Sequence, residues 1–264
     1  MQDFTVSLVQ TVLHWHEPAS NRAMLADLLE SALDHQGLTD LIVLPEMFTT
    51  GFTMDAPARA EPTDGPTLAW MREQAARHNA VVTGSVLVAE DGRYYNRLLW
   101  VRPDGSYAGY DKRHLFRLAG EHEVFTAGSQ RLLEEWRGWR ILPLVCYDLR
   151  FPVWSRNRPA QPFDLLLYVA NWPQPRIEAW KTLLRARAIE NVSYVVGVNR
   201  VGTDGQRLNY DGQSAILDMQ GNYLAQAGNM HTVLTRTLQA EALTEFRENM
   251  PFLLDADEFY YPPA

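Results

Sequence analysis

The sequence predicts an α/β fold, a four-layer α-β-β-α sandwich formed by a single domain over residues 1–264. Apolar segments of strand length alternate with helical segments, and this order occurs twice along the chain. No Pro/Gly/Ser-rich linker and no change in composition separates the two halves. Helices between strands cover one face of a sheet, so two such halves most simply pack sheet against sheet with helices outside.

The first half is predicted to run strand, helix, strand, helix, and then strands in hairpins. Ser20 or Asn21 is the expected N-cap of the first helix and Gly37 its stop, whereas Pro66 lies near the first position of the second helix. The apolar run LIVLP is too continuous for a half-exposed strand, so we expect a buried one. The expected ranges are strands at 4–11, 39–46 and 80–90, strands within 94–112, and helices at 20–37 and 64–79, with Asp-Gly turns at 91–92 and 104–105 joining the strands of the hairpins.

The second half repeats this order. A short helix is expected near residues 152–157, and a longer amphipathic helix over 176–191. The C-terminal tail, about residues 250–264, is aromatic but has no period, so we expect it to pack on the domain or on a partner subunit. The other expected elements are strands at 131–136, 139–148, 163–171, 193–202, 212–218, 222–226 and 231–238, and a helix at 239–249.

Charge and cysteine content exclude several classes of protein. The net charge of -8 argues against a nucleic-acid or anionic-membrane surface, because both require basic patches. The N-terminus has no signal-peptide pattern, and no apolar stretch has the length of a membrane span, so we expect a cytoplasmic protein. A single cysteine forms no internal disulfide and excludes Cys₄ and Cys₂His₂ metal sites. We expect no metal and no cofactor.

Three predicted strands end in a chemically reactive residue: Glu46, Lys112 and Cys146. Ligands of open α/β sheets gather beyond the carboxyl ends of strands. Lysine occurs only at 112 and 181, so arginine supplies the general surface charge, and a lysine retained at 112 is a candidate for a site that needs a compact ammonium. The structural alternatives are a solvated carboxylate at a strand end and an inert, buried thiol.

Together these three groups are suited to acyl transfer from an amide or a nitrile. A carboxylate can take the thiol proton when desolvation raises its pKa, and an ammonium favours the thiolate and stabilises the oxyanion of a tetrahedral intermediate. The backbone N–H of Tyr147, directly after the cysteine, is a natural second donor.

Five separated motifs then identify a family resemblance. They are LIVLPEMFTTGF, YDKRHLF, GEHEVFTAG, LVCYDLRFP and ANWPQPR with the following LLRARAIEN. In order and spacing they resemble the nitrilase superfamily of carbon–nitrogen hydrolases, and within it the omega-amidase branch, over about residues 4–240. The resemblance implies an αββα sandwich whose subunits pair into homodimers. It also implies hydrolysis of a small-molecule amide, 2-oxoglutaramate or 2-oxosuccinamate, to the 2-oxo acid and ammonia, in some bacteria beside methionine salvage.

The resemblance also implies roles for individual residues. Glu46 would be the general base, Lys112 the oxyanion lysine and Cys146 the nucleophile. Glu121 falls where many members have a second glutamate that positions substrate and lysine; Glu123 competes for this role, but the spacing to the following glycine favours Glu121.

Two further residues are expected to bind substrate. Arg150 occupies the place where related amidohydrolases bind a substrate carboxylate; the alternative is an ion pair with Asp148 or another acid. Trp172 is expected to form a wall of the pocket, and the alternative is plain packing.

Other functions stay open at this point. A Cys–His hydrolase would use His114 or His122 as its base. A nitrilase or an N-carbamoyl amidohydrolase would keep the chemistry on another carboxylated substrate. A non-catalytic protein on the same fold would bind an amide without turnover, although such a protein would have no need of the three reactive residues.

Overall fold

Two six-stranded mixed sheets form the centre of the molecule. The computed structural model of the chain describes residues 1–36 and 39–260. The strands of the first sheet lie in the order β14-β1-β2-β3-β4-β5. Their bounds are β1 Phe4–Gln10, β2 Leu41–Val43, β3 Val81–Glu90, β4 Arg93–Val101, β5 Tyr107–Asp111 and β14 Thr232–Leu238.

The second sheet has the order β13-β12-β9-β8-β7-β6. Its strands β7, β8 and β9 are parallel neighbours, as are β1, β2 and β3 in the first sheet. The bounds are β6 Glu134–Trp136, β7 Trp139–Val145, β8 Leu165–Val169, β9 Tyr194–Val198, β12 Ala215–Leu217 and β13 Tyr223–Gln226. A separate two-stranded ribbon is made by β10 (Val201–Thr203) and β11 (Asn209–Asp211).

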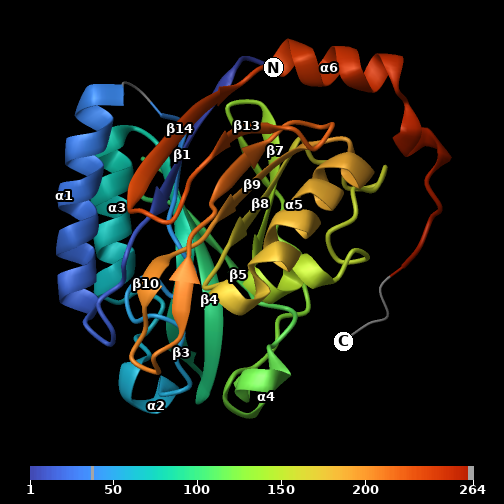
Figure 1. The fold of residues 1–264 in the computed structure, drawn as a ribbon. Helices are drawn as coiled ribbons and strands as arrows, with labels where there is room; N and C mark the ends of the chain where they lie inside the picture. Colours follow the sequence, from blue (N-terminus) through green and yellow to red (C-terminus); the bar gives the residue numbers. More distant parts are fainter. Residues whose placement is uncertain (37–38, 261–264) are drawn as a thin grey trace.

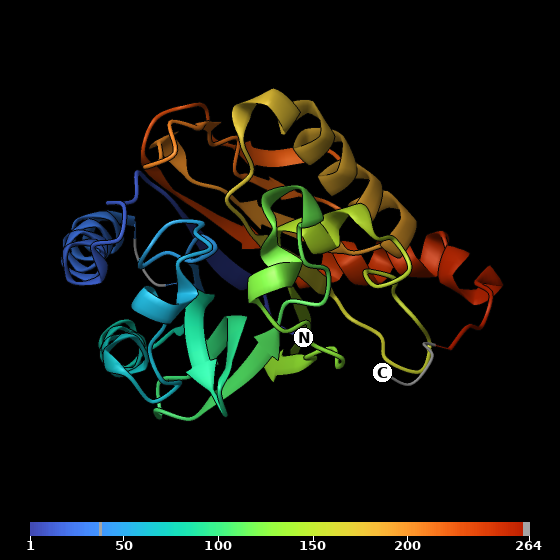
Figure 2. The same cartoon turned by 90° about the horizontal axis from the view of Figure 1, so that it is seen from below.

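Helices cover the outer face of each sheet. Figures 1 and 2 show α1 (Pro18–Gln36) and α3 (Pro66–His78) beside the first sheet, and α5 (Ile177–Asn191) beside the second. The four-layer α-β-β-α order predicted from the sequence is therefore confirmed. The remaining helices are α2 Ala56–Arg59, α4 Glu121–Val124 and α6 Ala240–Asn249, with 3₁₀ helices η1 Arg117–Ala119, η2 Cys146–Arg150, η3 Gln174–Arg176 and η4 Phe252–Asp255.

The alternation of side chains in β2 explains why its apolar run is continuous. Leu41 and Val43 pack into the core between the two sheets, whereas Ile42 and Leu44 pack with the residues of α1 and α3. Both faces of the strand are thus buried, as expected for a parallel strand covered on both sides. Within the described residues, no helix is long and apolar enough to span a membrane.

Several local predictions were wrong. Residues 152–155 form turns and residues 156–157 belong to no regular element, so the expected short helix is absent. The N–H of Asn157 donates to the Asn191 side chain at 2.7 Å, where a continuing helix would use a carbonyl of its own preceding turn. The first helix begins at Pro18, and the Asn21 side chain bonds the backbone of His14 instead of capping the helix. The predicted stop at Gly37 lies outside the described residues.

The predicted strand over 193–202 is also wrong in its second half. It divides after Val198, and the next strand joins the two-stranded ribbon. The buried Asn199 side chain causes this break: it donates to the carbonyl oxygens of Trp172 and Gly212 and accepts from the N–H of Trp172, so it replaces ladder bonds with loop contacts.

Candidate active site

The reactive residues come together where strands from both sheets end. Lys112 directly follows β5 and Cys146 directly follows β7, whereas Glu46 lies in the turn after β2. Strand β2 is shorter than predicted, so Glu46 is placed by a loop and not by the strand itself. Asn171, which follows β8, fixes that loop: its N–H donates to Glu46 Oε2 at 2.8 Å, and its side-chain amide donates to the Glu46 carbonyl at 2.5 Å.

Lys112 is held between two buried carboxylates. Its Nζ lies 2.9 Å from Glu46 Oε1 and 2.9 Å from both carboxylate oxygens of Glu121. Asn96 of β4 donates to Glu46 Oε1 at 2.8 Å and to Glu121 Oε1 at 3.3 Å, and so links the two acids. The side chains of both glutamates are fully buried and that of Lys112 is 1% exposed, so these contacts act without screening by water.

The charges of this cluster shift one another's proton affinities. Burial by itself lowers the pKa of Lys112, but the negative charges of Glu121 and Glu46 outweigh it and raise that pKa well above its ordinary range. Burial raises the pKa of Glu121, and the charge of Glu46 adds to the rise while Lys112 opposes it. The lysine is therefore a permanent cation, and Glu121 can hold a proton at lower cost than in water.

Cys146 lies at the junction of β7 and η2 in a left-handed backbone conformation, with φ 41°. A non-glycine residue in this region is strained, and such strain is found at functional sites. Burial raises the pKa of the Cys146 thiol, and the nearby Glu46 carboxylate raises it further, against the opposing charge of Lys112. The free thiol is thus neutral, and its proton has an acceptor in Glu46.

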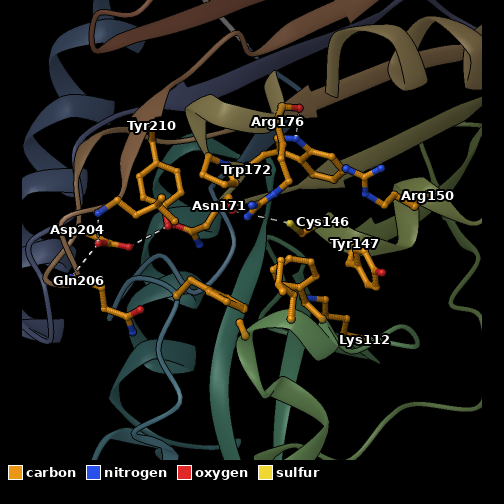
Figure 3. A pocket seen from close by; sticks show the side chains of 16 residues that line it. Lys112, Cys146, Tyr147, Arg150, Asn171, Trp172, Arg176, Asp204, Gln206 and Tyr210 are labelled. Carbon is orange, nitrogen blue, oxygen red and sulfur yellow. Dashed lines mark hydrogen bonds between the residues drawn. The ribbon is translucent and has the colours of Figure 1, made fainter. Parts of the chain in front are cut away.

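A pocket of about 280 Å³ opens onto the thiol. Figure 3 shows its side chains, with Cys146 and Lys112 at one side and Asp204, Gln206 and Tyr210 at the other. Its wall is mainly aromatic and apolar, with two arginines among the polar lining groups. The other lining residues are Phe52, Phe116, Leu118, Ala119, Tyr147, Arg150, Asn171, Trp172, Pro173, Arg176 and Leu208.

Known proteins are similar to this chain over nearly its whole length. A family model described as carbon–nitrogen hydrolase matches residues 5–248. The chain belongs to the carbon–nitrogen hydrolase family. It is 48% identical to "Omega-amidase YafV" of Yersinia enterocolitica over 260 residues, which cover 98% of this chain and 99% of the relative. It is 32% identical to "2-oxoglutaramate amidase" of Bacillus subtilis, with 98% and 99% of the two chains covered.

A solved member of the family has the same fold. The crystal structure of a CN-hydrolase superfamily protein from Xanthomonas campestris matches with a TM-score of 0.96 and 51% identity, covering 99% of this chain and 100% of that one. The Xanthomonas protein carries an arsenic adduct in its active site. The family resemblance inferred from five motifs is thereby confirmed.

The structure separates the two candidate glutamates. Glu121 is fully buried and bonds Lys112, and it also accepts the N–H of Phe116 at 2.6 Å. Glu123 has a side chain that is 75% exposed and lies 3.9 Å from His122. The structure therefore places Glu121, and not Glu123, in the cluster around Lys112.

The expected substrate-binding residues also line the pocket. The Arg150 guanidinium lies over the Trp172 ring, 5.0 Å from its centroid, and Tyr147 is the second residue of η2. Because the first N–H groups of a helix have no intrahelical acceptor, the N–H of Tyr147 is free of helix bonding. Asp148 does not pair with Arg150, since its carboxylate accepts hydrogen bonds from Tyr110, His114 and Val145.

Both histidines of the alternative mechanism are engaged elsewhere. His114 Nδ1 lies 2.8 Å from Asp148, and its ring stacks on Phe151 with centroids 3.7 Å apart. His122 lies beside the exposed Glu123. The charges that act most strongly on the Cys146 thiol are those of Glu46 and Lys112.

Sequence reasoning missed Asn96 and Asp148. Asn96 occupies the face of β4 on which Leu98 and Trp100 enter the inter-sheet core, so a polar residue at a core-facing position was the available signal. Asp148 was considered only as a partner of Arg150. Its four hydrogen-bonded contacts tie the turn after Cys146 to the loop that follows Lys112, a link between segments that sequence spacing does not reveal.

Proposed function

We propose that this protein is an omega-amidase, which hydrolyses the terminal amide of 2-oxoglutaramate or 2-oxosuccinamate to the 2-oxo dicarboxylic acid and ammonia. The observation that carries the proposal is the buried cluster of Glu46, Lys112 and Cys146 at one side of a pocket that also holds Arg150. The names of the relatives from Yersinia and Bacillus support the same substrate class.

The cluster is suited to both halves of such a reaction. The Cys146 sulfur attacks the amide carbon while its proton passes to Glu46, and Lys112 Nζ and the Tyr147 N–H stabilise the oxyanion. Glu46 then gives this proton to the departing nitrogen, so ammonia leaves and a thioester remains. Water attacks the thioester as Glu46 takes its proton, and the proton returns to the sulfur when the acid is released. Glu121 positions Lys112 throughout.

Arg150 would bind the 1-carboxylate of the substrate, because a guanidinium offers two parallel N–H donors to a carboxylate. Its stacking on Trp172 leaves the edge of the guanidinium available for such a pair. An uncharged amide would leave this cation desolvated and unpaired, and the site should reject it.

Ammonia release from a panel of substrates tests the proposal. The panel contains 2-oxoglutaramate, 2-oxosuccinamate, butyramide, a nitrile and an N-carbamoyl amino acid. We expect kcat/KM for the 2-oxo ω-amides to exceed that for butyramide by roughly 100-fold or more, as expected for loss of a buried charged pair. Faster turnover of the nitrile or the carbamoyl acid would favour those alternatives, and binding of 2-oxo ω-amides without turnover would indicate a non-catalytic protein.

We further propose that the enzyme works in the cytoplasm as a homodimer, and that its reaction serves methionine salvage. Support for a dimer comes from the C-terminal segment, where Phe252 and Leu254 of η4 expose 57% and 83% of their surface. Large apolar side chains exposed together on a surface are typical of interaction sites. Phe252 and Leu254 would then pack on the partner subunit, whereas Phe259, farther along the tail, lies beneath the Arg158 guanidinium of its own chain.

A further inference from the structure

The pocket contains a second guanidinium, that of Arg176. This residue ends η3 and directly precedes α5, and its backbone carbonyl accepts the Trp172 indole N–H at 2.8 Å. Its side chain lies over the ring of Phe116, 5.2 Å from the centroid. In Figure 3 this side chain extends into the pocket toward Asn171 and Cys146, whereas Arg150 approaches from the side of Tyr147 and Trp172.

Neither pocket arginine is neutralised by the protein. Among residues 1–36 and 39–260, no carboxylate forms an ion pair with Arg150 or Arg176, whereas Lys112 has two. The one acid among the pocket-lining residues of this part of the chain, Asp204, has its oxygens occupied by the N–H groups of Gln206 and Leu208 and by the Tyr210 hydroxyl. The pocket therefore presents two cations to its ligand.

One carboxylate needs only one of these cations. Arg150 is assigned to the 1-carboxylate under the proposed function, and the amide end of the substrate lies at Cys146. The part of the substrate between them carries the 2-oxo group, whose oxygen accepts hydrogen bonds. A guanidinium that reaches inward from the start of α5 is suited to this oxygen.

We infer that Arg176 is a specificity-determining residue that binds the 2-oxo oxygen, and thereby selects 2-oxo ω-amides over 2-amino ω-amides such as glutamine. This inference rests on the proposed function. The physical basis of selection is charge: a 2-ammonium group beside Arg176 would be repelled, and it would also leave the guanidinium without an acceptor.

Three ω-amides of one chain length test the inference: 2-oxoglutaramate, glutaramate (the same carboxylate and amide without a 2-substituent) and glutamine. Arg176→Gln should lower kcat/KM for 2-oxoglutaramate by roughly 10- to 100-fold, the usual range for a hydrogen bond to a charged group. The value for glutaramate should change by less than about threefold, since no contact to its carboxylate is removed. The value for glutamine should stay the same or rise.

Two variants serve as controls. Lys181→Gln removes one positive charge from α5 outside the pocket, where Lys181 pairs with the exposed Glu178. This variant should leave kcat/KM unchanged for all three ω-amides. Arg176→Lys retains the charge and should still reject glutamine. Thermal unfolding of each variant checks that the fold is intact, and the Arg176 side chain can be shortened without removing the backbone contact to Trp172.

The outcomes are distinguishable. If Arg176→Gln lowers kcat/KM for 2-oxoglutaramate and for glutaramate equally, or lowers neither value, the inference is overturned while the proposed function stands. If the unmodified enzyme turns over none of the ω-amides, the proposed function itself fails and the inference fails with it.

Discussion

Cys146 is surrounded by charges that act on its thiol in opposite directions. Burial and the Glu46 carboxylate raise the thiol pKa, whereas Lys112 lowers it. The resting thiol is therefore neutral, and in the proposed mechanism the thiolate forms only when Glu46 receives the proton during attack. This arrangement protects the sole thiol of the chain from oxidation and alkylation between turnovers, because the thiolate is the reactive species.

Replacing each charged neighbour should shift the thiol pKa with opposite signs. Glu46→Gln removes a negative charge and should move the pH profile of alkylation by iodoacetamide to lower pH. Lys112→Met removes a positive charge and should move it to higher pH. Both variants should lose amidase activity, so the alkylation rate of Cys146 measured against pH is the informative reading.

Because the chain has one cysteine, alkylation reports on Cys146 alone. Lys181→Gln provides the matched control, since this half-buried lysine is also paired with a glutamate but lies outside the pocket. Shifts of both variants in the same direction would contradict the electrostatic account of the site.

At the scale of elements, the turn that carries the nucleophile depends on one buried carboxylate. Asp148 in η2 accepts from the Val145 N–H at 3.0 Å, from the His114 N–H at 3.0 Å and from the Tyr110 hydroxyl at 2.7 Å. It thereby joins the end of β7 to the end of β5, so that Cys146 and Lys112 keep a fixed separation. Strands β5 and β7 alone do not set the distance between Lys112 and Cys146; the segments that follow the two strands must also be held together.

Asp148→Asn should destabilise the protein and weaken catalysis. The asparagine side chain would have only one acceptor oxygen, and its NH₂ group would point at donors that now bond the second oxygen of Asp148. Each buried donor left without an acceptor costs about 1–3 kcal/mol. We expect the free energy of unfolding in urea to fall by roughly 2–4 kcal/mol, together with a lower kcat. The same substitution at Asp104, an exposed turn carboxylate, should leave the free energy of unfolding nearly unchanged. Equal effects at the two positions would refute the role given to Asp148.

At the scale of the whole molecule, the proposed dimer depends on the C-terminal segment. Leu254 exposes 83% of its surface, and a charge placed there should not disturb the folded subunit. Leu254→Glu should convert the dimer to a monomer in sedimentation velocity, because burying an unpaired carboxylate in an interface is costly.

Leu118 provides the control for this prediction, because it is similarly exposed, at 80%, but lies at the pocket on η1. Leu118→Glu should leave the mass of the assembly unchanged. A monomeric unmodified protein, or a Leu254→Glu variant that stays dimeric, would show that the tail does not form the interface.

The sequence by itself predicted the layers of the fold and four residues that the structure brings together beside the pocket. Continuous apolar runs such as LIVL indicate strands buried on both faces, and this pattern requires helices outside and a second sheet inside. Glu46, Lys112, Cys146 and Glu121 could be predicted because each lies in a short motif of fixed spacing. A structural feature can be predicted from the sequence when all the residues that specify it lie in one strand or turn.

Only the tertiary structure decided which distant groups meet. Asn96, Asp148 and Arg176 lie on separate elements, and their contacts to Glu46, to His114 and to the ring of Phe116 depend on how the two sheets and η3 are packed. The break of the predicted strand at Asn199 has the same origin, since its side chain bonds loops that are remote in sequence. Hydrogen bonds and charge interactions act over a few ångströms in space, and chain order does not specify which side chains come within that range.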